Sequence, residues 1–195
     1  MTCIAGIKDK DRVWIGADSF GSTNSYGIVY NNKKVFKLKD NKNMLIGYTT
    51  SFRMGDLLEY SKGLIDEMSL LKNEIIDREY IVTKIIPRIS RLFADNKFET
   101  NDRGEASGGD FLLANNTDLY LVQDDYSVVE PKEGFISCGS GMYFALSSMY
   151  TTQNTDMSPV ERIKLALETA EHFQINVRRP FVIMNTLDDE VIVIE

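Results

Sequence analysis

The chain has 195 residues, of which 43% are hydrophobic and 26% charged, and this predicts one domain spanning 1–195 with a large core. Its formal net charge is −7 and its lysines and arginines are scattered, so it lacks the basic stripe of proteins that bind nucleic acid or anionic membranes. No apolar run approaches the roughly 20 residues that span a bilayer. The sequence contains two cysteines, Cys3 and Cys138, which fits a reducing compartment. These features predict a cytoplasmic protein with no nucleic-acid or membrane partner.

The single histidine, His172, follows Glu171 in a predicted helix, with no cysteine or histidine at metal-ligand spacing. We interpret it as an exposed residue near the end of that helix. The sequence therefore predicts no metal or cofactor site, and it does not favour a Ser-His-Asp triad.

The first fifty residues are predicted to form strands, because β-forming residues occur in short runs separated by charged or polar turns. The runs "CIAGIKD" and "RVWIGADS" are apolar at nearly every position, which indicates strands covered on both faces. The predicted strands of this part are 3–9, 12–19, 26–39 and 44–50.

Helical periodicity follows in two segments. The first is 51–68, whose apolar residues fall on one side of a helix: Met54, Leu57, Leu58, Leu64, Ile65 and Met68. The second is 77–96, in which Pro87 is expected to kink the helix or mark a boundary. The stretch 101–109 is polar, contains glycines and predicts a loop.

The second half repeats the order of strands and then helices. Ser158 before Pro159, with Glu161 in the first turn, marks a helix start, and "NNTD" at 115–118 is typical of a hairpin turn. The predicted strands are 110–116, 118–123, 126–131, 134–139, 181–186 and 190–195, and the predicted helices are 139–152 and 157–174. Because helices occur in pairs, a doubly wound parallel sheet is disfavoured. The order predicts an α/β (α+β) fold, a four-layer αββα sandwich of two antiparallel sheets flanked by helix pairs.

Thr2 is the first candidate functional residue, because removal of Met1 would give it a free α-amine beside its hydroxyl, a base and a nucleophile in one residue. If the first hairpin turns near Lys10, the numbers of facing residues add up to about 20, within one, and Thr2 lies opposite Asp18. A third strand containing "NNKKVF" is expected beside these two, so that Lys33 or Lys34 points inward, with Asp18 as its counter-ion. A nearby ammonium would lower the pKa of the amine and favour an alkoxide.

Several segments together resemble the N-terminal-nucleophile (Ntn) hydrolases, and within them the proteasome β-subunit-like threonine peptidases. They are "TCIAGI" followed by "GADS", then "NKKVFKL", "LIGYTTSF" and "CGSGMYFA". The resemblance implies Thr2 as nucleophile and Lys34 as the catalytic lysine, held by Asp18. It also implies that the backbone N–H of Ser51 forms the oxyanion hole and that Ser140 is a helper serine.

The same resemblance maps the pocket-lining positions of the family onto Gly21, Asn32, Phe36, Thr49 and Arg53. The residues expected to bind substrate are Ser22, Thr49 and Arg53. Arg53 would favour an acidic or polar substrate side chain. The chain departs from the family pattern at "FQINVRRPF", where Gln174 and Val177 fall near the positions of an expected Asp and Ser, and Asn176 is an alternative substitute.

We therefore expect a threonine-type hydrolase, specifically a peptidase, that uses no cofactor and acts on a peptide or protein. Family analogy adds a homo-oligomeric ring, a possible unfoldase partner and a likeness to the simple ring proteases of bacteria or phages. Two alternatives stay open: a catalytically silent ring or assembly protein, and an amidase acting on a small molecule. Cys3 would be the second residue of the processed chain, and we interpret it as a packed strand thiol.

Overall fold

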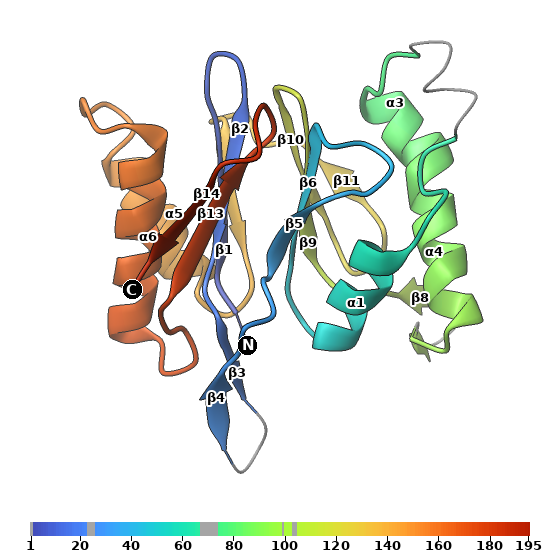
Figure 1. Cartoon of the computed structure of the whole chain (residues 1–195), viewed down its shortest axis with the longest axis horizontal. Coiled ribbons are helices and arrows are strands. Elements are labelled where there is room, and N and C mark those ends of the chain that lie inside the picture. The colour runs from blue at the N-terminus through green and yellow to red at the C-terminus, as the bar shows by residue number, and fades with distance from the viewer. Residues whose placement is uncertain (1, 23–25, 67–73, 99, 103–104) are drawn as a thin grey trace.

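The computed structural model describes residues 2–22, 26–66, 74–98, 100–102 and 105–195. Two five-stranded antiparallel sheets pack face to face, and helices cover the outer face of each sheet (Figure 1). The predicted four-layer αββα sandwich is confirmed. A cluster of buried residues that includes Ile4, Ile15, Leu45 and Leu112 fills the space between the sheets.

The first sheet carries both ends of the chain. Its order is β12-β1-β2-β13-β14, with β1 (Ile4–Lys8), β2 (Val13–Ala17), β12 (Phe135–Cys138), β13 (Phe181–Asn185) and β14 (Val191–Ile194). Ile4 pairs with Ala17, which places Asp18 opposite Cys3 and next to Thr2, within the predicted margin of one residue. The apolar residues of β1 and β2 are buried on both faces, as predicted.

Two helices cover this sheet, α5 (Met142–Thr151) and α6 (Pro159–Phe173). The predicted start of α6 is confirmed: the Glu161 N–H donates to Ser158 Oγ (3.3 Å), and the Ser158 N–H donates to the Glu161 carboxylate (2.7 Å). This reciprocal pair satisfies two backbone donors that the helix cannot pair internally. His172 lies exposed in the last turn of α6, as predicted.

The second sheet has the order β11-β10-β9-β6-β5. Its strands are β5 (Val35–Lys37), β6 (Met44–Tyr48), β9 (Phe111–Asn115), β10 (Asp118–Val122) and β11 (Val128–Val129). The predicted hairpin turn between β9 and β10 is confirmed, with Asp118 facing Asn115 and Asn116 in the left-handed region at a φ of 50°. On its outer face lie α1 (Phe52–Tyr60), α3 (Arg78–Tyr80), a π-helical turn (Ile81–Ile85) and α4 (Ile86–Asp95).

The expectation of one strand over 26–39 is wrong. Gly27–Val29 forms β4, which pairs with an unpredicted strand, β3 (Phe20–Ser22), whereas β5 lies at the edge of the second sheet. The segment "NNKKVF" therefore does not add beside β1 and β2, because the second edge of β2 is taken by β13. Val35–Lys37 pairs instead with β6, the next strand along the chain.

The predicted helix 51–68 is too long. Helix α1 ends at Tyr60, and Gly63 has a φ of +79°, which a helix cannot continue through. Leu64 and Ile65 are still buried in the core under α1, although the chain there is irregular. Their apolar character therefore reflects burial and not helical structure. Met68 lies outside the described residues.

Two other expectations concern the following segments. Pro87 marks a boundary, as predicted: the Ile86 N–H reaches back to the Ile81 carbonyl in a π-type turn, and α4 begins there. The predicted loop 101–109 is wrong in part, because β7 (Thr100–Asp102) and β8 (Glu105–Ser107) form a two-stranded ribbon. The two strands pair through backbone hydrogen bonds, which any residue type can make, so the polar composition of this segment did not exclude strands.

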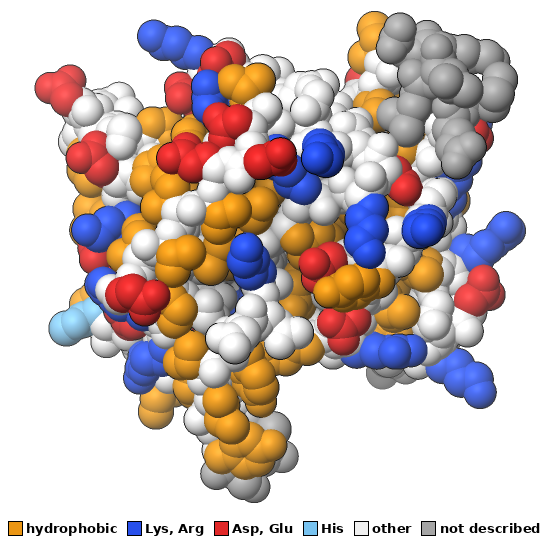
Figure 2. All heavy atoms as spheres, viewed as in Figure 1, with side chains coloured by type: hydrophobic (Ala, Val, Ile, Leu, Met, Phe, Trp, Pro, Cys, Tyr) orange, Lys and Arg blue, Asp and Glu red, His pale blue; other side chains and the backbone are white. Residues whose placement is uncertain are grey.

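The β3–β4 ribbon projects from one end of the sandwich, near the N-terminus (Figure 1). Apolar side chains are exposed on it (Figure 2), including Tyr26 at 57%, Ile28 at 48% and Val29 at 47%. Within the described ranges, no helix combines the length and apolar character needed to cross a membrane.

Candidate active site

Thr2 lies just before β1, at the end of the sandwich from which the β3–β4 ribbon projects. It is 4% exposed, and its backbone nitrogen donates to Ser140 Oγ at 3.3 Å. The Gly141 N–H donates to the Thr2 carbonyl at 3.2 Å. Gly139 has a φ of +88°, and a Cβ there would lie 2.3 Å from the Thr2 carbonyl oxygen, so only glycine allows this approach. The turn "GSG" thus holds Thr2 by its backbone and places Ser140 beside its nitrogen.

Asp18, directly after β2, forms a buried ion pair with Lys34. Their side chains are 0% and 3% exposed, and Lys34 Nζ donates to Asp18 Oδ1 at 2.9 Å. The Cys3 and Phe20 N–H groups also donate to the Asp18 carboxylate, each at 3.0 Å. Burial raises the pKa of Asp18 and lowers the pKa of Lys34, and the mutual attraction of the two charges opposes both shifts.

The two partners of this ion pair come from different sheets. Lys34 directly precedes β5 of the second sheet, and its carbonyl accepts from the Tyr48 N–H of β6 at 3.0 Å. Its side chain crosses to Asp18 and to the Phe20 carbonyl, which also accepts from Nζ. The packing of the two sheets therefore assembles the site, whereas the sequence suggested that Lys34 and Asp18 lie on neighbouring strands of one sheet.

The backbone between β6 and α1 makes a sharp turn at Thr50. Thr50 has a φ of 64°, a region that a β-branched residue rarely adopts. The turn brings the Ser51 N–H to the Thr49 carbonyl at 2.7 Å, and Ser51 then caps α1 by accepting from the Arg53 N–H at 3.1 Å. The Ser51 N–H lies beside the site but is engaged by a neighbouring carbonyl.

A small pocket of about 70 Å³ joins these elements. It is lined by Thr2, Phe20, Gly21, Ser22, Lys34, Thr50, Ser51 and Phe52. Of the residues expected to bind substrate, Ser22 lines the pocket and Thr49 and Arg53 lie outside its lining. The Thr49 hydroxyl donates to the Asp110 carbonyl at 2.7 Å, and Arg53 is exposed.

Among the additional positions, Gly21 lines the pocket, Asn32 is exposed and Phe36 is buried in the core under α1.

The segment "FQINVRRPF" after α6 forms a bonded cap. The Gln174 amide donates to the Ser140 carbonyl at 3.2 Å, which links this segment to the turn that holds Thr2. Val177 is fully buried. The Arg178 guanidinium donates to three carbonyls in the last turn of α6 and the segment after it, those of Glu171, Gln174 and Val177. Asn176 is half-buried.

Three residues that line the pocket were not predicted from the sequence: Phe20, Thr50 and Phe52. The Phe20 N–H donates to the Asp18 carboxylate, and the Phe20 carbonyl accepts from Lys34 Nζ. Both are backbone groups, so the residue type does not indicate these hydrogen bonds. Thr50 lines the pocket and has a positive φ. Glycine and asparagine are the residues that usually adopt a positive φ, so a threonine gives no indication of this turn. The Cys3 thiol is buried, as predicted, and burial with the neighbouring Asp18 charge raises its pKa to about 12.

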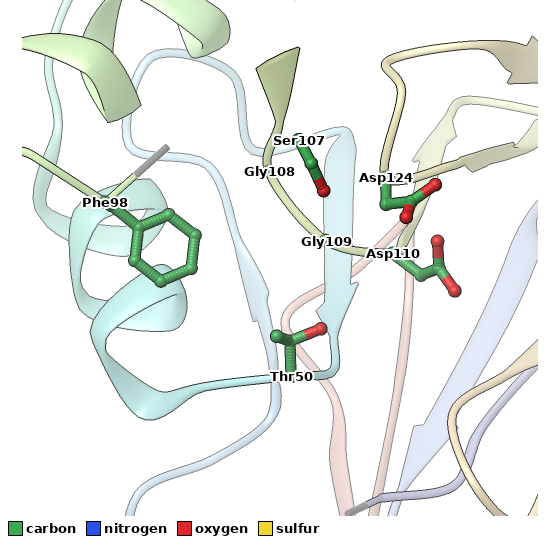
Figure 3. A pocket seen from close by; sticks show the side chains of 7 residues that line it. All are labelled: Thr50, Phe98, Ser107, Gly108, Gly109, Asp110 and Asp124. Atoms are coloured by element: carbon green, nitrogen blue, oxygen red, sulfur yellow. The ribbon is translucent and has the colours of Figure 1, made fainter. Parts of the chain in front are cut away.

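A second pocket of about 330 Å³ also has Thr50 in its lining (Figure 3). The side chains of Asp110 and Asp124 lie next to each other at one end, and Phe98 lies at the opposite end. Burial, followed by the charge of Asp124, raises the pKa of Asp110. This pocket shares only Thr50 with the pocket that holds Thr2.

An αββα sandwich with a buried lysine–aspartate pair beside a threonine at the start of the chain is the arrangement of an Ntn hydrolase. In this chain, the threonine and the buried ammonium of Lys34 line the same small pocket. Within the described residues, no cluster of side chains suited to a metal ion is found.

Comparison with known proteins identifies the family. Residues 1–174 match the sequence profile of the proteasome subunit family, and the chain belongs to that family. The ATP-dependent protease subunit HslV of Caldicellulosiruptor saccharolyticus is 25% identical over 174 residues, which cover 87% of this chain and 89% of that protein.

Solved structures show the same fold. Thiobacillus denitrificans BPH, in complex with epoxomicin, superposes with a TM-score of 0.68 at 18% identity, covering 99% of both chains. Eukaryotic HslV from Trypanosoma brucei gives a TM-score of 0.66 at 16% identity, covering 94% of this chain and 98% of that chain. The predicted likeness to proteasome β subunits is confirmed, and N-terminal threonine peptidase activity is the activity of the family.

Proposed function

We propose that the chain is a threonine peptidase that uses Thr2 as its nucleophile once Met1 is removed. The observation that carries this proposal is the buried Asp18–Lys34 pair, whose ammonium lines the same pocket as Thr2. Because well-packed apolar side chains of similar volume are often at least as stable as a buried ion pair, stability alone does not account for this pair. An ammonium with a lowered pKa beside a hydroxyl supports an alkoxide and exchanges protons readily.

The reaction follows from these groups. Thr2 Oγ attacks the carbonyl carbon of a peptide bond, and its proton passes to the α-amine of the same residue. The C–N bond breaks as that proton moves to the departing amine, which leaves an ester on Thr2. Water then attacks the ester, releases the acid and returns the proton to Thr2. Lys34 stabilises the negative charge near Oγ, and Ser140 orients the amine through its hydroxyl.

The oxyanion forms next to the Ser51 N–H. Because that N–H donates to the Thr49 carbonyl at 2.7 Å, the developing oxyanion has to replace this carbonyl as acceptor. A charged oxygen accepts a stronger hydrogen bond than a neutral carbonyl, which favours the exchange in the transition state.

An epoxyketone such as epoxomicin tests the proposal, since a structural relative is known in complex with that compound. Protein that begins at Thr2, verified by intact mass, should gain the mass of one inhibitor, and Thr2→Ala should gain none. Lys34→Ala should react at least about 100-fold more slowly, whereas Lys33→Ala, at the exposed neighbouring lysine, should react like the wild type. An unmodified wild type, or an equal adduct on Thr2→Ala, would refute the proposal.

A catalytically silent assembly subunit is the second candidate. It is favoured by the segment after α6, where Val177 is fully buried and Gln174 bonds the Ser140 carbonyl in place of the Asp and Ser usual in the family. Retention of Met1 in protein from its native host, together with no epoxyketone adduct, would support this candidate.

We also propose a homo-oligomeric ring in the cytoplasm that works with an unfoldase. The name of the relative, an ATP-dependent protease subunit, supports such a partner, and the exposed apolar side chains of the β3–β4 ribbon support self-association. Native mass spectrometry would give the subunit number, and a monomer at micromolar concentration would contradict the ring. An active monomer would favour a small-molecule amidase instead.

A further inference from the structure

Two aromatic rings close the pocket that holds Thr2. Phe52, the first residue of α1, lines the pocket, and Tyr30, which follows β4, packs edge-on against it with ring centroids 4.8 Å apart. Both rings pack on Gly21 of β3: a Cβ at Gly21 would lie 2.6 Å from an atom of each ring. The Tyr30 N–H donates to the Ser19 carbonyl at 2.9 Å, which fixes Tyr30 to the chain that carries Asp18. The rings are therefore wedged between the β3–β4 ribbon and α1.

The remaining space is small. The pocket measures about 70 Å³, whereas an apolar cavity known to bind benzene measures about 150 Å³. The side chain of the residue whose carbonyl is attacked has to lie near Thr2, and Thr2 lines this pocket. A benzyl side chain does not fit there unless Phe52 moves, and Tyr30 stands behind Phe52.

The lining also includes polar side chains. Ser22, Thr50 and Ser51 contribute hydroxyl-bearing side chains, and the one charged group among the lining residues, Lys34, is already paired with Asp18. A small neutral side chain therefore meets no unpaired charge and displaces little water. An acidic side chain would gain little attraction from an ammonium that Asp18 neutralises.

We propose that the site selects peptides with Gly, Ala or Ser on the carbonyl side of the scissile bond, and that Phe52, held by Tyr30, sets this limit. This inference rests on the proposed peptidase function. Phe52 acts as a specificity-determining residue, because removing its ring would extend the pocket toward Tyr30 and admit larger side chains.

The test uses three peptide epoxyketones that differ only in the side chain next to the reactive ketone: methyl, isobutyl and benzyl. Adduct formation is followed by intact mass on protein that begins at Thr2. The wild type should react at least about 10-fold faster with the methyl probe than with the benzyl probe, since pockets discriminate by factors of this size. Phe52→Ala should abolish or reverse the preference.

Tyr60→Ala is the matched control, because Tyr60 ends the same helix and is 63% exposed, away from the pocket lining; it should keep the wild-type preference. If Phe52→Ala fails to fold by circular dichroism, Phe52→Leu should still raise the relative rate of the isobutyl probe. Equal wild-type rates with all three probes, or an unchanged preference in a folded Phe52 variant, would overturn the inference. No adduct with any probe would instead refute the peptidase proposal, so the two failures are distinguishable.

Discussion

Removal of one partner of the Asp18–Lys34 pair should destabilise the fold strongly and asymmetrically. Asp18→Asn leaves the Lys34 ammonium 3% exposed with the Phe20 carbonyl as its remaining described acceptor. An uncompensated buried charge of this kind costs about 3–5 kcal/mol in the free energy of unfolding. Asp18→Asn also weakens the hydrogen bonds from Cys3 and Phe20, because a neutral amide oxygen is a poorer acceptor than a carboxylate.

Lys34→Met should cost less, about 2 kcal/mol, because the Asp18 carboxylate keeps two backbone N–H donors at 3.0 Å. The double variant should lose less than Asp18→Asn alone, because methionine removes the charge that asparagine leaves unpaired. The expected coupling energy is therefore at least about 2 kcal/mol, within the range measured for contacting residues.

The free energies of unfolding can be measured by urea denaturation of the four proteins at one protomer concentration, with circular dichroism as the signal. A coupling energy below about 0.5 kcal/mol would show that the two side chains do not interact, and the site described above would then be wrong. A larger loss from Lys34→Met than from Asp18→Asn would contradict the assignment of the two N–H donors to Asp18.

Five further predictions concern four single residues. Ser158→Ala should lower the free energy of unfolding by about 1 kcal/mol, measured by urea denaturation, because it removes the N-cap of α6. Arg178→Met should cost about 1.5–3 kcal/mol in the same assay, since three carbonyls lose a charged donor. Thr50→Gly should raise the free energy of unfolding by about 1 kcal/mol, because glycine adopts the φ of 64° without strain. The Cys3 thiol, with a pKa of about 12, should resist iodoacetamide at pH 8 in the native protein and react once unfolded. Because the folded thiol keeps a proton that the unfolded one loses near pH 8.5, Cys3 should make stability fall as pH rises from about 8.5 toward 12.

The fold could be predicted from the sequence because its signals are local. Strand runs such as "RVWIGADS", the start of α6 at Ser158 and the turn at Asn116 each depend on residues close together in the chain, and the structure confirms them. The misplacement of β5 arose because the strand that decides it is distant in the chain. Strand β13 occupies the second edge of β2, and β5 therefore pairs with β6 in the other sheet. No residue near Val35 indicates this arrangement.

In the candidate site, the ion pair was predicted correctly although the placement of the strand that carries Lys34 was wrong. The wrong strand placement still brought Lys34 to Asp18, because the requirement was electrostatic: a buried ammonium needs a buried carboxylate, and Asp18 is the acid beside Thr2. The pair now spans the interface between the sheets, so the charge next to Thr2 is set by how the sheets pack. Features carried by backbone geometry, such as the Thr50 turn and the Phe20 carbonyl, have no counterpart in residue type and were not predictable. It follows that variants in the core between the sheets, for example at Ile15 or Leu45, should alter the reactivity of Thr2 without touching it.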